Sequence, residues 1–294
     1  MLEMQSYLKG IESSLVRDLV WCLLSPCPVN EKSSIPLVTD KEKQDWFNEH
    51  RNLIETWAKN DELYKEKVSE LLKNNRLGYY FEALFLSFFY LSPSFEVVIA
   101  NHQVVAHKTT IGEIDLIVKK DDILLHLELS VKFYLQTKES ELFEDWVGPN
   151  GRDNFLKKRN KLINQQLKMT NYLDLGNRER LKSKALICGQ FFQNNGTRIS
   201  WQGNKTAIRQ YLHRKDLQSF LSINEVDKVY LLRKPNWLSH QVFKDESLSY
   251  KVNDTFYEEI DKGLNMKKAT LIGLLLNNMY QTLFIVSDTW PKLP

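Results

Sequence analysis

The chain has 294 residues, of which 43% are apolar and 26% are charged, and its formal net charge is +3. This length can bury a substantial core, and the composition is ordinary for a folded protein, which excludes a disordered or fibrous chain. The apolar run at 269–276 is too short to span a bilayer, and residues 1–24 lack the basic start of a secretory signal. We therefore expect a cytoplasmic protein without membrane contact.

The three cysteines support the same compartment. Cys22, Cys27 and Cys188 are an odd number and show no metal-ligand spacing. We expect free thiols in a reducing environment.

Residues 1–75 are predicted to form a helical cap. Apolar residues recur at helical spacing from Leu8 to Leu23, which predicts one helix over 7–24 that ends before Pro26. Residues 41–72 are charged, with an apolar stripe that includes Trp46 and Trp57, and they predict one or two further helices.

The segment 76–91, RLGYYFEALFLSFFYL, is apolar nearly all round and predicts a buried helix. Glu82 is its only acidic residue. A buried carboxylate needs a partner, because an unpaired buried charge is strongly unfavourable. Either Arg76 pairs with Glu82, or Glu82 lines a metal site; we favour the metal site because the helix leads into the strands described next.

Residues 95–107 are predicted to form a strand, and residues 110–134 two more, joined by a polar turn at 119–122. Side chains alternate along a strand, so Asp115 should share one face with its neighbours at odd positions. On the following strand, Glu128, Ser130 and Lys132 share the polar face. The hairpin therefore predicts two carboxylates and an ammonium on one side of a sheet.

A loop is predicted over 136–152, and it closes on the turn sequence Gly148-Pro149-Asn150-Gly151. Asp153 is a candidate N-cap for a helix that reaches about residue 173, and a buried strand is predicted at 183–193. One face of that helix is predicted to be polar, and we expect its residues to bind nucleic acid: Lys158, Lys161, Gln165 and Lys168.

Local charge separates this part of the chain from the rest. Residues 151–184 contain ten lysines or arginines and three acids, a net charge of +7, so the remaining residues sum to −4. Such a concentration suits a surface that follows phosphates, although a solvated helix face would show the same pattern.

The last third of the chain is predicted to alternate short elements. Helices are predicted at 205–221, 256–263 and 267–276, and strands at 228–233 and 282–286. The sequence leaves open whether this region joins the same sheet or stands apart.

The hairpin residues suit magnesium chemistry. Mg²⁺ prefers oxygen ligands and commonly uses one or two carboxylates together with substrate phosphate. Asp115 and Glu128 could hold Mg²⁺ (or Mn²⁺), Glu82 could hold a second ion or an ordered water, and a lysine could stabilise charge on the phosphate.

This pattern resembles the PD-(D/E)XK nuclease superfamily, which includes restriction endonucleases. Gly112-Glu113-Ile114-Asp115 looks like the first half of the signature, Glu128-Leu129-Ser130 occupies the place of Glu-x-Lys, and Glu82 looks like the upstream helical glutamate. The resemblance covers residues 76–193. It implies an α/β fold with a restriction-endonuclease-like core: helix, three strands, helix and strand around a mixed sheet.

The whole chain also resembles an uncharacterised bacterial family within that superfamily. Four features carry this likeness: Asp18-Leu19-Val20-Trp21, Arg76-Leu77-Gly78 with Phe81-Glu82, Glu128 followed by Lys132-Phe133-Tyr134-Leu135, and the Gly148-Pro149-Asn150 turn. One departure is that Ser130 occupies the usual lysine position. Lys132 lies two positions further along the same face, about 6.6 Å away at the usual rise, and Lys161 could also substitute.

The resemblance implies three regions: a helical cap (1–75), a nuclease-like core (76–200) and a mixed α/β C-terminal region packed on the core (201–294). It also implies a Mg²⁺-dependent deoxyribonuclease with catalytic residues Asp115, Glu128, Lys132 and Glu82, which acts on DNA and could form a homodimer. Two alternatives stay open. The chain could be an inactive nuclease-fold protein that binds nucleic acid, or a scaffold that binds a protein partner through an ion-paired hairpin face.

Overall fold

The structure, a computed structural model, is a mixed α/β fold. Its described strands form a ten-stranded mixed sheet in the order β1-β2-β3-β5-β6-β10-β9-β7-β8, with β4 paired to β3. Within the described part of the chain, no helix is long and apolar enough to cross a membrane. The residues that the structure describes are 2–29, 33–106, 108–140, 142–175, 180–194, 208–226, 228–239, 249–266, 269–276 and 279–291.

The chain divides into two compact units. The central unit comprises Ile11–Val131 and Lys157–Cys188, and the C-terminal unit comprises Met1–Gly10, Lys132–Leu156 and Gly189–Pro294. The strands β3 and β5 each have residues in both units, so each unit is described by itself below.

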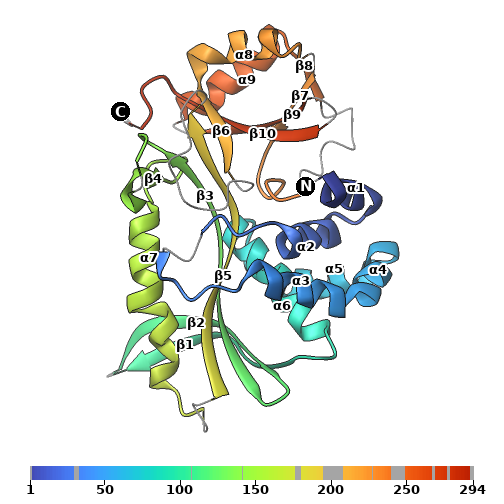
Figure 1. Ribbon diagram of the computed structural model, residues 1–294, viewed down its shortest axis with the longest axis vertical. Coiled ribbons are helices and arrows are strands. Elements are labelled where there is room, and N and C mark those ends of the chain that lie inside the picture. The colour runs from blue at the N-terminus through green and yellow to red at the C-terminus, as the bar shows by residue number, and fades with distance from the viewer. Residues whose placement is uncertain are drawn as a thin grey trace. The chain divides into compact units, whose positions relative to one another are not determined.

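In the central unit, the helices α2 to α6 pack on one another (Figure 1). The apolar helix α6 supplies much of their core, because ten of its residues are buried, including Phe81, Phe85, Phe88 and Phe89. It ends one residue before the Ser92-Pro93 step, where proline disfavours a helical conformation. The helices of this unit are α2 (Ser14–Leu24), α3 (Asp40–Glu49), α4 (Arg51–Lys59), α5 (Glu62–Leu71), α6 (Leu77–Leu91), α7 (Phe155–Asn164, whose first two residues belong to the other unit) and the 3-10 helix η3 (Gln166–Tyr172).

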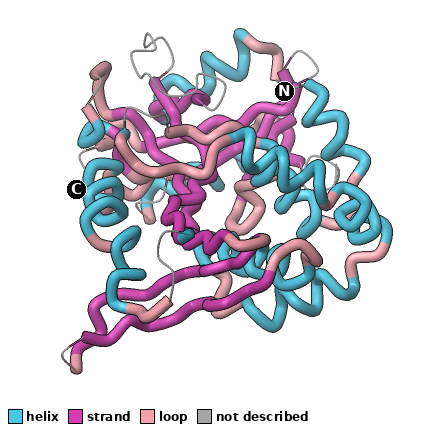
Figure 2. Tube along the Cα trace, turned by 60° about the horizontal axis from the view of Figure 1, so that its bottom comes forward, coloured by secondary structure: helices cyan, strands magenta, loops and turns pink. Residues whose placement is uncertain are grey.

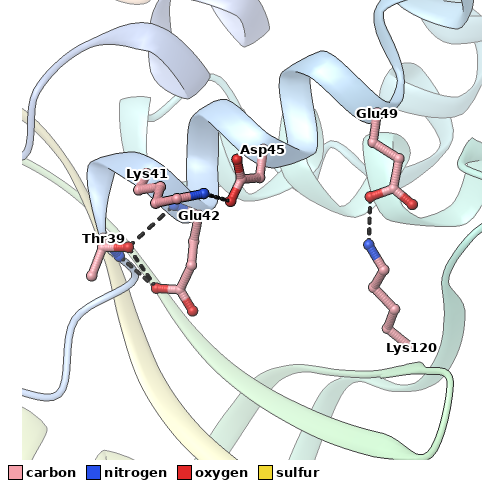
Figure 3. A network of polar contacts seen from close by, with 6 residues as sticks. All are labelled: Thr39, Lys41, Glu42, Asp45, Glu49 and Lys120. Carbon is pink, nitrogen blue, oxygen red and sulfur yellow. Dashed lines mark hydrogen bonds and ion pairs between the residues drawn. The ribbon is translucent and has the colours of Figure 1, made fainter.

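The helix α3 is fixed at both ends (Figure 3). At its start, Thr39 and Glu42 form a reciprocal capping box. At its end, the Glu49 carboxylate pairs with the Lys120 ammonium at the end of β2. In its first turn, Glu42 also pairs with Lys184 of β5 at 2.5 Å. The helix is therefore connected to two strands of the sheet by ion pairs.

The strands of the central unit form the predicted hairpin. The strands β2 and β3 are antiparallel with Leu116 opposite Leu127. One step further the same register sets Asp115 opposite Glu128, so both carboxylates lie on the same side of the hairpin. The pair β1 and β2 comes forward in Figure 2. The strands concerned are β1 (Glu96–Ala106), β2 (Thr109–Lys120), β3 (Ile123–Gln136) and β5 (Leu181–Asn194).

The C-terminal unit places two helices against its part of the sheet (Figure 1). Leu217 and Leu221 of α8 and Phe256 and Ile260 of α9 join one buried apolar cluster with residues of β6, β7, β9 and β10. The elements are α1 (Leu2–Gly10), η2 (Phe143–Asp145), β4 (Trp146–Val147), β6 (Ile208–His213), η6 (Arg214–Asp216), α8 (Leu217–Ile223), β7 (Lys228–Leu232), β8 (Ser249–Lys251), α9 (Asp254–Asn265), β9 (Thr270–Leu276) and β10 (Met279–Val286).

The sequence predicted several elements correctly. The buried helix at α6, the three strands β1, β2 and β3, the buried strand β5, the strands β7 and β10 and the helix α9 lie where they were expected. The order helix, three strands, helix and strand is present from α6 to β5, with the short strand β4 inserted. That insertion corrects the prediction of a plain loop over 136–152, because Trp146 pairs with Gln136 of β3.

Other predictions were wrong. The helix predicted over 7–24 is two helices, α1 and α2, because Ser13 caps a new start by accepting from the Val16 N–H. Residues 41–72 form three helices, not one or two.

In the last third, β9 replaces the helix predicted at 267–276, because it pairs on both sides with β7 and β10. A buried strand is apolar on both faces, so its pattern resembles a buried helix. The helix predicted at 205–221 is, within the described residues, the strand β6 followed by η6 and α8; residues 205–207 lie outside the described part.

In the C-terminal unit, β5 passes very close to β3 at Gly189. A methyl group at this position would lie 1.8 Å from the carbonyl oxygen of Lys132, and the backbone φ of Gly189 is +130°. Only glycine satisfies both the close approach and this conformation. By contrast, a methyl group on Gly78, near the start of α6, would meet no atom within 4 Å.

We therefore predict that Gly189→Ala destabilises the protein strongly, by about 2 kcal/mol or more, because the strands must separate or the backbone must strain. Gly78→Ala is the matched control and should be neutral or stabilising by up to about 1 kcal/mol, since alanine favours a helix. Urea unfolding of both variants measures the difference. Equal stability of the two would contradict the close approach of β3 and β5.

Candidate carboxylate site

Three acidic side chains from three elements of the central unit form the site, and Asp115 of β2 is its centre. The backbone N–H of Leu129 on β3 donates to Asp115 Oδ2 at 2.8 Å, which fixes the carboxylate against the neighbouring strand. Burial and the nearby charge of Glu128 raise the pKa of Asp115 to about 7. The chain therefore holds an acid where its ionised form is disfavoured.

Glu128 of β3 is fully buried and is held by two side chains. His126 Nε2 lies 3.2 Å from Glu128 Oε1, and the amide of Gln166 donates to Oε2 at 2.5 Å. Burial raises the pKa of Glu128 to about 7, although the charges of Lys158 and Lys161 oppose this rise. The polar face of β3 is consequently much more enclosed than the half-buried face that the sequence predicts.

The imidazole of His126 orients this glutamate. Burial lowers the pKa of His126 to about 4, so the ring is neutral at pH 7. A carboxylate can only accept, so we assign the proton to Nε2, which donates to Glu128, while Nδ1 accepts from the Ser183 hydroxyl at 3.1 Å. His126 lies two residues before Glu128 and therefore on the same face of β3, whereas no sequence pattern points to Ser183.

The third acid, Glu82 of α6, lies within electrostatic reach of Asp115. Burial, followed by the charge of Asp115, raises its pKa to about 7. In the described part of the chain no side chain forms an ion pair or hydrogen bond with its carboxylate, so the pairing with Arg76 that the sequence left open is not observed. The placement agrees with the expectation that α6 carries Glu82 toward Asp115.

The cation of the site is Lys158 of α7. Its ammonium donates to Gln166 Oε1 at 3.1 Å, and Gln166 in turn holds Glu128. The charge of Lys158 lowers the pKa values of Glu82, Asp115 and Glu128, against the larger effect of burial. The sequence analysis assigned Lys158 only to a DNA-binding face and missed this role.

Lys132 has a different partner. Its ammonium lies 2.7 Å from Asp153 Oδ2, an oxygen that also accepts from the Tyr134 hydroxyl at 3.0 Å. Lys132 and Asp153 belong to the C-terminal unit. Asp153, expected to be the N-cap of the next helix, instead pairs with two β3 side chains, and α7 begins two residues later.

The predicted nucleic-acid residues do not share one α-helix. The helix α7 ends at Asn164, and the chain continues into η3, so Lys158 and Lys161 lie on α7 whereas Gln165 and Lys168 flank or belong to η3. The α-helix ends because the backbone at Gln165, whose φ and ψ are −127° and −71°, leaves the helical region before η3 begins at Gln166. Lys161, Gln165 and Lys168 are exposed, and Lys158 is half-buried.

The donor set suits a hard divalent cation. Within the described residues, no group of three or more His, Cys, Asp or Glu side chains has a geometry that could hold a metal ion. Mg²⁺ needs fewer protein ligands, since one or two carboxylates with waters and substrate phosphate suffice. Asp115 and Glu128, opposite each other and with pKa values raised to about 7, are acids whose charge a cation would stabilise.

The fold and the site define an α/β protein with a buried carboxylate cluster on a mixed sheet. Residues 17–281 match the family described as a domain of unknown function (DUF1853), and the chain belongs to that family. No curated protein and no solved structure gives a significant match.

The raised pKa values predict how stability depends on pH. An acid whose pKa is higher in the folded chain than in the unfolded chain binds its proton more tightly when folded. Its ionisation therefore lowers the free energy of unfolding as pH rises from about 4 to about 7. Above pH 7 this loss of stability is complete and constant. Asp115→Asn removes this effect and keeps an oxygen to accept from Leu129, so it should stabilise the metal-free protein by about 2 kcal/mol at pH 8 and much less at pH 4.

Urea unfolding with a chelator at both pH values measures this gain. Glu66→Gln, an exposed acid of α5, is the control and should change stability little at either pH. A loss of stability in Asp115→Asn at pH 8 would show that the Asp115 charge is not destabilising.

Proposed function

We propose that this protein is a Mg²⁺-dependent nuclease of the PD-(D/E)XK type, which hydrolyses phosphodiester bonds in DNA. One observation carries the proposal: α6, β2 and β3 bring Glu82, Asp115 and Glu128 into one cluster, and the charge of Lys158 acts on all three. The order of elements from α6 to β5 supports a restriction-endonuclease-like core.

Each residue has a defined task in this proposal. Asp115 and Glu128 would hold the metal ion, with Glu82 beside them, and the ion would supply Lewis-acid stabilisation of charge on the phosphate. The neutral His126 and Gln166 keep the Glu128 oxygens in place. Lys158 would take the place of the signature lysine, because Ser130 occupies the usual position and Lys132 pairs with Asp153.

The lysine assignment differs from the one that the sequence favours. An ammonium near the scissile phosphate can stabilise its developing negative charge or orient the attacking water. Lys158 is close enough to the carboxylates for its charge to lower their pKa values. A phosphate bound at the same carboxylates would therefore also lie near the Lys158 ammonium. The exposed Lys161, Gln165 and Lys168 would contact phosphates along the strand and contribute to binding rather than to the chemical step.

A second candidate is a nuclease-fold protein that binds DNA without cutting it. The observation that favours it is the state of Glu128, which is fully buried with both oxygens already accepting hydrogen bonds. If those bonds persist when DNA binds, Glu128 would be less available to a metal ion. The following measurements separate the two candidates.

Purified protein should nick supercoiled plasmid DNA in Mg²⁺ or Mn²⁺, and a chelator should stop the reaction. Asp115→Asn should reduce the rate by at least about 100-fold, because a group that stabilises the transition state is lost. Glu66→Gln should leave the rate unchanged. Salt-sensitive DNA binding without any nicking by the wild type would favour the non-cutting candidate.

The choice of lysine gives a separate prediction. Lys158→Gln should lower kcat by at least about 100-fold, whereas Lys132→Gln should have a much smaller effect. Lys168→Gln should mainly weaken binding and reduce the salt slope of DNA affinity by about 1. If Lys132→Gln proves the more damaging variant, the sequence-based lysine is correct and the assignment of Lys158 is wrong.

A further inference from the structure

A second candidate site lies in the C-terminal unit and shares no residue with the carboxylate cluster. It is a cavity of about 590 Å³ between the end of β7, the helix α9 and the start of β9. Pockets of 300–1,000 Å³ are typical of sites for small molecules. The turn Gly148-Pro149-Asn150-Gly151, which the proposed nuclease does not use, contributes Asn150 to its lining.

The charged side chains of the cavity are mostly basic. Arg233, Lys234 and Lys262 line it, with Glu259 as the only acid among the lining residues. Lys262 Nζ lies 2.8 Å and Arg233 Nη2 lies 3.7 Å from the oxygens of Glu259, so one carboxylate serves two cations. The walls therefore carry a net charge of +2, which an anion would balance.

Lys234, the third cation of the lining, does not share the ion pairs that Arg233 and Lys262 form with Glu259. Its ammonium lies 4.4 Å from the centre of the Trp237 ring, and among the described residues no carboxylate lies within ion-pairing distance of it. Burial and the nearby charge of Lys132 lower the pKa of Lys234. Like-charge repulsion of this kind would be relieved by a bound anion.

The wall beneath Lys234 is rigid. Trp237 is buried, its Nε1 donates to the Leu232 carbonyl at 2.8 Å, and its ring packs edge-on against Phe133 and Phe284, each at 5.2 Å. The Asn150 turn is equally fixed by two main-chain bonds of 2.7 Å, from Gly148 to Asp153 and from Gly151 to Gly148. A preorganised wall lowers the entropic cost of binding.

The other side of the cavity is apolar. Its lining includes Leu231, Leu271, Ala269 and Met266, and the last of these is 61% exposed although it is a large apolar side chain. A ligand that used both sides would need an anionic end and an organic body.

We propose that this cavity binds a nucleotide-sized organic phosphate, with its phosphates against Lys234, Arg233 and Lys262 and its organic body against the apolar wall. A net charge of +2 suits a phosphate better than a single carboxylate, and arginine and lysine are the usual phosphate-binding side chains. The volume accommodates one such molecule. This site is independent of the proposed nuclease, because none of its residues belongs to the carboxylate cluster.

Isothermal titration calorimetry with ATP as the probe tests the proposal on the full-length protein. The wild type should bind ATP, and Lys234→Gln should weaken the dissociation constant by at least about tenfold. Ala269→Trp, which places a large ring in the cavity, should also abolish binding. Lys215→Gln is the matched control, because it removes an exposed cation of the same unit that does not line the cavity.

Two further measurements test which ligand the cavity binds and whether that binding is independent of the carboxylate cluster. Asp115→Asn should bind ATP like the wild type, so loss of nuclease activity and loss of this site can be told apart. Thermal unfolding confirms that each variant is folded. Absence of ATP binding to the wild type, equal loss in Lys215→Gln, or binding of a short single-stranded oligonucleotide but not of ATP would each overturn the proposal.

Discussion

The central unit buries three acidic side chains close to one another, and the rest of the candidate site depends on this arrangement. Desolvation raises the pKa values of Glu82, Asp115 and Glu128 to about 7 each, although Lys158 acts in the opposite direction. Repulsion adds to this rise, because Asp115 acts on Glu82, Glu128 acts on Asp115, and Glu113 acts on all three. Such an arrangement is unfavourable for the folded chain by itself. Strongly shifted pKa values are common at functional sites, and the proposed Mg²⁺ would offset the repulsion among these carboxylates.

The surroundings of the cluster are built to keep it in place. Leu129 donates a backbone N–H to Asp115, and His126 and Gln166 hold the two oxygens of Glu128. Further out, α3 is connected to the strands by the ion pairs of Glu49 with Lys120 and Glu42 with Lys184. These hydrogen bonds and ion pairs hold the carboxylates of Asp115 and Glu128 in defined orientations on the sheet.

The sequence predicted correctly the features that depend on local residue patterns within one helix or one hairpin. The apolar run of α6 and the alternation in β2 and β3 follow from local spacing, and the register that sets Asp115 opposite Glu128 follows from a short polar turn. Lys158 and Gln166 could not be assigned in this way, because their roles depend on how α7 and η3 lie against β3. The sequence offered one signal toward Lys158: under the proposed nuclease function, Ser130 stands where a lysine is expected, so another cation would have to supply the charge.

The same reasoning explains the wrong elements. The segment at 267–276 is apolar on every side, and only its pairing with β7 and β10 decides that it is a strand. The break between α1 and α2 depends on a single capping serine within an otherwise continuous apolar pattern. Both errors arise because local periodicity does not determine which long-range partners a segment finds.

The interleaving of the two units has a consequence for how the chain is made. The polypeptide passes from one unit to the other after Gly10, Val131, Leu156 and Cys188, so neither unit is a continuous stretch of sequence. In the C-terminal unit, β6 pairs with β10, whose residues are synthesised some seventy positions later. A nascent chain on the ribosome therefore cannot complete that part of the sheet until β10 has emerged, so this unit should fold late and slowly compared with a unit built from local contacts.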